Sequence, residues 1–70
     1  MELQPHQQRV VTEKDELDEK IEKLSKFFRH QNFPHLAEAE KNRLEEQYRH
    51  MQAYSLVLGA RIEAFKIAHA

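Results

Sequence analysis

Seventy residues with 33% charged and 40% hydrophobic side chains, one glycine and two prolines favour long helices in a single domain over residues 1–70. The formal net charge of −1 argues against a protein that binds DNA, RNA or anionic lipid through its overall charge. The absence of cysteine excludes a disulfide framework, a thiolate nucleophile and a cysteine-based metal site.

The first predicted helix spans about residues 5–30. Pro5 suits the first helical position, where its missing N–H costs nothing. A narrow apolar stripe recurs every seven residues, at Val10, Leu17 and Leu24. Such a stripe is typical of a helix that packs along another helix. Lys14 stands in the neighbouring row where an apolar residue is expected, and a capping box at Thr12 leaves a later helix start open.

Residues 31–36 form the predicted turn, because Pro34 biases Phe33 away from helical geometry. The second predicted helix covers about residues 37–68 and carries a matching stripe, at Leu44, Met51, Leu58 and Phe65. A short connection between two long helices predicts an all-α fold, an antiparallel two-helix hairpin. Positions whose numbers sum to roughly 67 should then lie side by side.

The second helix carries a further apolar set on a face turned away from the hairpin seam. Its members are Ala53, Leu56, Val57, Ala60, Ala64 and Ile67. A two-helix hairpin buries only one face of each helix, which rarely gives independent stability. Because apolar patches of this extent usually mark interfaces, we expect the hairpins to assemble into a homo-oligomeric helical bundle through this set. The number of subunits stays open.

The side chains offer little for catalysis or metal binding. The five histidines include no i,i+4 pair and no H-E-x-x-H motif, so we expect no metal site. The hydroxyl residues form no nucleophile–base set, and no glycine-rich loop exists to hold phosphate. We therefore expect a protein that is not an enzyme and uses no cofactor.

Antiparallel pairing gathers a polar set at the open end of the hairpin: His6, Arg9, Glu13, Tyr54 and Arg61. Arg9 and Arg61 could bind a phosphate in bidentate fashion. Tyr54 could stack on a base, and His6 could add a hydrogen bond. The alternative is structural: an arginine pairs with Glu13 in a salt bridge within the hairpin or between subunits, while Tyr54 packs in the interface.

Two sequence blocks carry a family resemblance. They read H-Q-Q-R-V-V-T-E-K-D-E-L-D-E-K-I-E-K-L over residues 6–24 and M-Q-A-Y-S-L-V-L-G-A-R-I over residues 51–62. An F-P-x-L turn at residues 33–36 stands between them. With these blocks the chain resembles a family of short helical proteins encoded by crAss-like and other tailed phages. His6, Arg9, Glu13, Tyr54 and Arg61 all stand in the two blocks.

The resemblance implies a phage protein that works in the cytoplasm of a bacterial host. The lack of a secretory leader and of an apolar run of about 18 residues also predicts a cytoplasmic protein. Its size and expected oligomeric design are similar to those of anti-defence sponges, helical oligomers that hold a nucleotide immune signal. We therefore predict a sponge that sequesters a cyclic oligonucleotide or a cyclic ADP-ribose derivative between its subunits without cleaving it.

Two other functions remain open. One is an oligomeric interaction protein that inhibits a host or phage protein through its apolar second helix. The other is a nucleic-acid-binding accessory protein, which the acidic first helix and the net charge disfavour.

Overall fold

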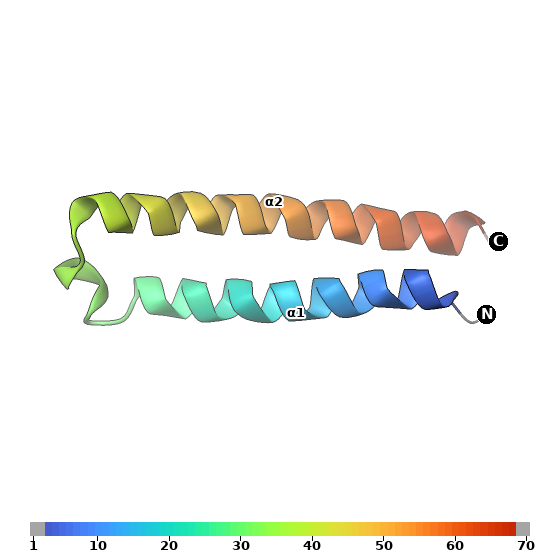
Figure 1. Cartoon of the computed structure of the whole chain (residues 1–70), viewed down its shortest axis with the longest axis horizontal. Coiled ribbons are helices and arrows are strands. Elements are labelled where there is room, and N and C mark those ends of the chain that lie inside the picture. The colour runs from blue at the N-terminus through green and yellow to red at the C-terminus, as the bar shows by residue number, and fades with distance from the viewer. Residues whose placement is uncertain (1–2, 69–70) are drawn as a thin grey trace.

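The protein is a hairpin of two long helices. In the computed structural model, residues 3–68 are described: α1 spans Pro5–Phe28, the short 3-10 helix η1 spans Phe33–His35, and α2 spans Glu38–Ala68. The helices run antiparallel in a rod of 50 × 15 × 15 Å, with the start of α1 and the end of α2 at the same end of the rod (Figure 1). The predicted all-α hairpin is confirmed. The association of hairpins into an oligomer stays a prediction.

Helix α1 starts at Pro5, and the side chain of Gln7 in its first turn accepts a hydrogen bond from the residue that precedes the helix. The N–H of Gln4 donates a hydrogen bond to Oε1 of Gln7 at 2.9 Å. Gln7 is buried, so this bond also satisfies part of an amide that has left water. Thr12 therefore lies inside α1 and does not cap its start.

Aromatic side chains close the turn end of the hairpin. Helix α1 ends at Phe28, two residues short of the expected position 30. Phe28 packs edge-on against both Phe33 and Tyr48, with ring centroids 5.2 Å apart in each pair. Edge-to-face rings at such distances stabilise one another beyond the area that they bury. The turn is thus fixed by packing as well as by Pro34.

The pairing of the helices is shifted from the expected register. Tyr48 lies against Phe28, and Asp18 accepts a hydrogen bond from Ser55. In each pair the two residue numbers add up to more than the expected sum of roughly 67, so the α2 residue lies further along the chain than predicted. The cause is visible in Figure 1, where α2 begins beyond the end of α1 because η1 carries the chain outward before it turns back.

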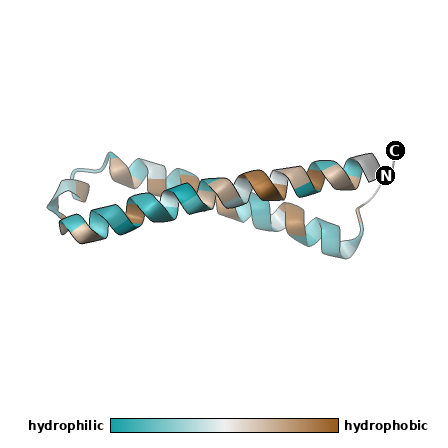
Figure 2. Ribbon diagram, turned by 90° about the horizontal axis from the view of Figure 1, so that it is seen from above, coloured by the Kyte–Doolittle hydropathy of each residue, from teal (hydrophilic) through white to brown (hydrophobic). Residues whose placement is uncertain are grey.

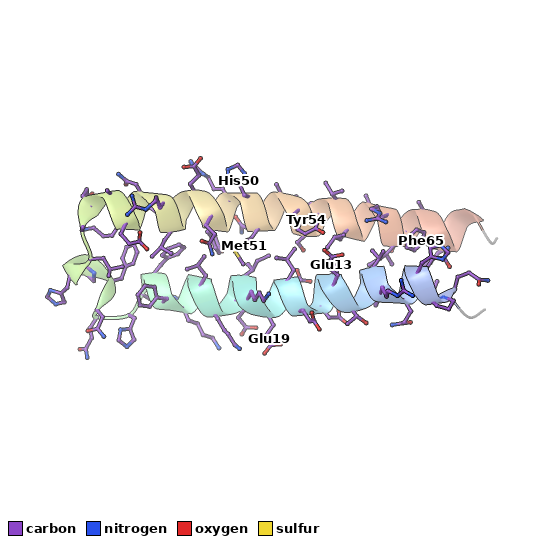
Figure 3. The ribbon with its side chains drawn as sticks, viewed as in Figure 1. Glu13, Glu19, His50, Met51, Tyr54 and Phe65 are labelled. Atoms are coloured by element: carbon purple, nitrogen blue, oxygen red, sulfur yellow. The ribbon has the colours of Figure 1, made fainter. Side chains whose placement is uncertain are left out.

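The hairpin core is a single seam with few deeply buried side chains. Val10, Leu17 and Leu58 are 7%, 9% and 0% exposed. Partly buried side chains pack against them: Ile21, Met51, Ile62 and Phe65. Met51 and Phe65 reach from α2 toward α1 in Figure 3. Because the stabilisation grows with the apolar area buried, a seam of this size holds an isolated hairpin only weakly.

Helix α2 changes character along its length, from hydrophilic near the turn to hydrophobic toward its C-terminal half (Figure 2). In that second half, apolar side chains lie on the side facing α1 and also on the opposite side. Leu56 and Val57, whose side chains lie outside the buried seam around Leu58, are 78% and 56% exposed. Ala53, Ala60 and Ala64 are exposed there too, whereas the side chain of Ile67, predicted for the same face, lies outside the described residues.

Neither helix, within residues 3–68, combines the length and the apolar character needed to cross a membrane.

Candidate functional site

The residues proposed from the sequence are spaced along one flank of the hairpin, where Glu13 and Tyr54 are the two whose side chains are bonded to each other among the described residues. His6, Arg9 and Glu13 follow one another at three- and four-residue steps on α1, and Tyr54 and Arg61 stand seven apart on α2. All five side chains are exposed, Tyr54 at 44%. We call this surface the Tyr54 flank.

A hydrogen bond between the helices anchors the Tyr54 flank. The hydroxyl of Tyr54 donates to Oε2 of Glu13, and the two side chains point toward one another across the hairpin (Figure 3). This bond, followed by desolvation and the negative charge of Glu13, raises the pKa of Tyr54 above its ordinary value of 10.0. The positive charge of Arg61 acts on the same pKa in the opposite direction and is the smallest of these causes.

The two arginines of the flank have no carboxylate partner within 4 Å among the described residues. The salt bridge to Glu13 that was the structural alternative is therefore not present inside this hairpin, where Glu13 binds Tyr54. An exposed guanidinium without a carboxylate keeps its planar set of donors available to an anion. His6 is exposed and makes no side-chain hydrogen bond to the described members of the flank.

A second polar cluster, which sequence reasoning missed, lies on the other flank. Nζ of Lys14 donates to Oδ2 of Asp18 at 2.8 Å and to Oγ of Ser55 at 3.1 Å. Ser55 is buried, and its hydroxyl donates to Oδ1 of Asp18. The bond from Lys14, and then that from Ser55, holds the pKa of Asp18 below its usual 3.8. The signal was present in the sequence, because Lys14 interrupts the apolar row on α1 and Ser55 does so on α2.

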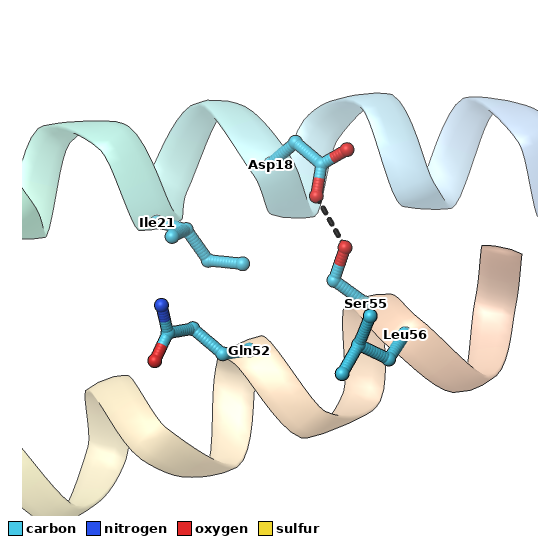
Figure 4. A pocket seen from close by; sticks show the side chains of 5 residues that line it. All are labelled: Asp18, Ile21, Gln52, Ser55 and Leu56. Carbon is cyan, nitrogen blue, oxygen red and sulfur yellow. Dashed lines mark hydrogen bonds between the residues drawn. The ribbon is translucent and has the colours of Figure 1, made fainter.

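An open groove of about 440 Å³ runs beside this cluster (Figure 4), lined by Asp18, Ile21, Gln52, Ser55 and Leu56. Its carboxylate and hydroxyl are already bonded to each other. Leu56 forms part of its wall and also belongs to the exposed apolar side of α2. The groove thus continues the apolar surface and offers few unsatisfied polar groups.

No group of three or more histidine, aspartate or glutamate side chains within the described part of the chain is arranged to hold a metal ion.

One known family matches this hairpin. The model of the Sequestin family aligns with residues 4–64, which include all of α1, the turn and most of α2. The chain belongs to the Sequestin family. The match spans every residue of the Tyr54 flank in this Sequestin-family chain. Comparisons with curated proteins and with solved structures gave no match. The phage origin suggested by the sequence stays a prediction.

Proposed function

We propose that this Sequestin-family chain is a phage anti-defence protein that sequesters a nucleotide immune second messenger without cleaving it. The ligand is a cyclic oligonucleotide or a molecule of the cyclic ADP-ribose type. The family name supports sequestration of some molecule. The observation that carries the choice of an anionic nucleotide is the Tyr54 flank, an exposed surface that holds one aromatic ring and two arginines, neither with a carboxylate within 4 Å among the described residues.

The residues of the Tyr54 flank have different roles in binding such a ligand. Arg9 and Arg61 contact phosphate oxygens through charge-assisted hydrogen bonds. Tyr54 stacks on a base, because every base offers a π-face. The bond to Glu13 holds the Tyr54 ring in place, which lowers the ordering cost of binding. His6 donates a further hydrogen bond to the ligand.

The binding pockets lie between subunits. On a single hairpin the Tyr54 flank is exposed on the surface of a rod only 15 Å across, so one chain covers only one side of a nucleotide. Small-molecule sites bury most of the ligand surface in a concave pocket. A second copy supplies the missing wall.

Calorimetry with a panel of cyclic oligonucleotides and cyclic ADP-ribose isomers tests this function. We expect at least one ligand to bind, and mass spectrometry of the heat-released ligand to show an unchanged mass. Arg61→Glu should weaken binding by about 10- to 100-fold, the range for loss of charged hydrogen bonds. Arg49→Glu is the matched control, since Arg49 is another exposed arginine of α2 outside the Tyr54 flank. A folded protein that binds no member of the panel would contradict the proposal.

The exposure of Leu56 and Val57 favours a second candidate, an oligomeric protein that inhibits a host or phage protein through α2. Under this alternative, Leu56→Asp abolishes capture of the partner while Arg61→Glu leaves capture unchanged. Pull-down from infected cells with both variants separates the two functions.

A further inference from the structure

The C-terminal half of α2 carries an apolar surface that the hairpin itself does not cover. We call it the outer face, and it consists of Ala53, Leu56, Val57, Ala60 and Ala64. We propose that two copies of this chain pair through their outer faces, antiparallel and centred on Ala60. Only the C-terminal halves of α2 then overlap, and the two turns point in opposite directions. This pairing rests on the proposed function, which needs a second copy to complete its pockets.

The first argument is the balance between what the hairpin buries and what it exposes. Leu56 is 78% exposed, while only a short seam around Leu58 is deeply buried within the described side chains. A chain of this size normally needs more buried apolar area than one seam provides. Covering Leu56 and Val57 with a second copy supplies that area.

The second argument is shape. Three positions of the outer face carry only a methyl group as their side chain: Ala53, Ala60 and Ala64. Helices with small residues at the contact approach more closely within the usual range of about 8–10 Å between axes. In an antiparallel pair centred on Ala60, Leu56 of one copy meets Ala64 of the other. The large side chain thus packs against a small one on both sides of the centre.

The third argument is the change of polarity along α2. The same side of its N-terminal half carries Glu46 and His50, whose Oε1 and Nε2 atoms lie 3.6 Å apart, and His50 points away from α1 (Figure 3). A parallel pair would place each of these polar side chains opposite its own copy, and like charges in contact disfavour association. The antiparallel pair leaves both residues outside the overlap.

The antiparallel pair also has a consequence for the binding flank. Its twofold axis passes between the two α2 helices near Ala60, perpendicular to both, so the Tyr54 flanks of the two copies fall on the same side of the dimer. Arg61 follows Ala60, and the two Arg61 residues therefore lie next to the axis, with one Tyr54 beyond each. Two guanidiniums at one axis repel each other until an anion separates them. The arrangement fits a ligand that carries two phosphates.

Single cysteines test the pairing, because the natural chain has none. We expect Ala60→Cys to give a covalent dimer with a short bis-maleimide. Ala39→Cys is the matched control, an exposed alanine in the hydrophilic half of α2. In the antiparallel pair two residues at position 39 are about 63 Å apart along the helix axes, so it should not cross-link.

Each other outcome overturns the pairing. Cross-linking at both positions means a parallel pair, and cross-linking at neither, with a single-chain mass in sedimentation of the unmodified protein, means no self-association. If the outer face instead binds a different protein, the monomeric chain should capture that protein. Nucleotide binding by a monomer contradicts the pairing and leaves ligand sequestration intact. Cross-linking at Ala60→Cys without binding of any nucleotide contradicts the ligand alone.

Discussion

The hydrogen bond from Tyr54 to Glu13 connects α1 and α2 on the flank that carries the arginines. Because the bond favours the protonated phenol, it stabilises the fold below the ordinary pKa of 10.0, and this contribution is lost as the pH rises through the raised pKa. We expect Glu13→Gln to lower the pKa of Tyr54. Ultraviolet absorbance of tyrosinate, measured with Tyr48→Phe as background, reports it. Glu16→Gln, another exposed carboxylate of α1, should leave the titration unchanged.

The Asp18 carboxylate contributes to stability with the opposite pH dependence from that of Tyr54. Its pKa in the fold lies below 3.8, so its stabilising effect is complete above that value and is lost as the pH falls through the lowered pKa. We expect Asp18→Asn to reduce the loss of thermal stability on acidification below pH about 4. Melting curves by circular dichroism between neutral and acid pH measure this. If the melting temperatures of the variant and the natural chain fall equally with pH, Asp18 does not contribute to the loss of stability in acid.

Single residues show where sequence reasoning stopped. Lys14 was recognisable as an exception in the apolar row, but its partners were not. They depend on the register of α2 and on the path of a long side chain across the seam, neither of which a seven-residue repeat specifies. By contrast, Glu13 and Tyr54 were expected side by side and are hydrogen-bonded, since a long side chain bridges the remaining offset.

The interior of α2 holds the one glycine of the chain, at Gly59. An alanine there should gain roughly 0.5–1 kcal/mol of helix stability. Its Cβ, however, would lie 3.3 Å from Cε of Lys14, which is held by bonds to Asp18 and Ser55. We therefore expect Gly59→Ala to gain less in the natural chain than in a Lys14→Ala background. Urea unfolding of the four proteins in this double-mutant cycle gives the coupling, and equal gains would contradict the contact.

At the level of helices, the sequence predicted the helical type of the two elements and their antiparallel direction better than it predicted the register between them. The heptad stripes ending in Leu24 and beginning with Leu44 bracket a break at Pro34, which implies two antiparallel helices. The same pattern does not describe the path between them. The turn includes η1 and aromatic packing around Phe28 and Phe33, and these displace α2 along α1. Because a turn's path depends on such contacts, sequence spacing alone misplaced the pairing.

The stability of the whole molecule should depend on its concentration, since folding and association are linked when only the assembly covers the outer face. We expect the melting temperature of the natural chain to rise with concentration and that of Leu56→Asp to be lower and independent of it. Asn42→Asp is the control, a new carboxylate at an exposed site in the hydrophilic half of α2. Concentration-independent melting of the natural chain would contradict association. Calorimetric scans over a hundredfold dilution measure it.

The outer face was recognisable from the sequence because Leu56 and Val57 fall on a different side of the helix from Leu58. A second copy was expected there, but its orientation was not, since hydrophobic periodicity gives the position of a surface and says nothing about how a second molecule is oriented on it. The proposed antiparallel orientation rests on the polarity change along α2, which Figure 2 shows.

The adjacency of the two described chain ends makes this hairpin suitable for genetic fusion of two copies in tandem. In the antiparallel pair, Ala68 of one copy and the start of the next lie about 24 Å apart along α2, counted as eight residues on each side of Ala60. Roughly eight extended residues cover that gap. A flexible linker of about twenty residues would therefore yield a single-chain dimer in which one Arg61 can be changed while the other stays intact.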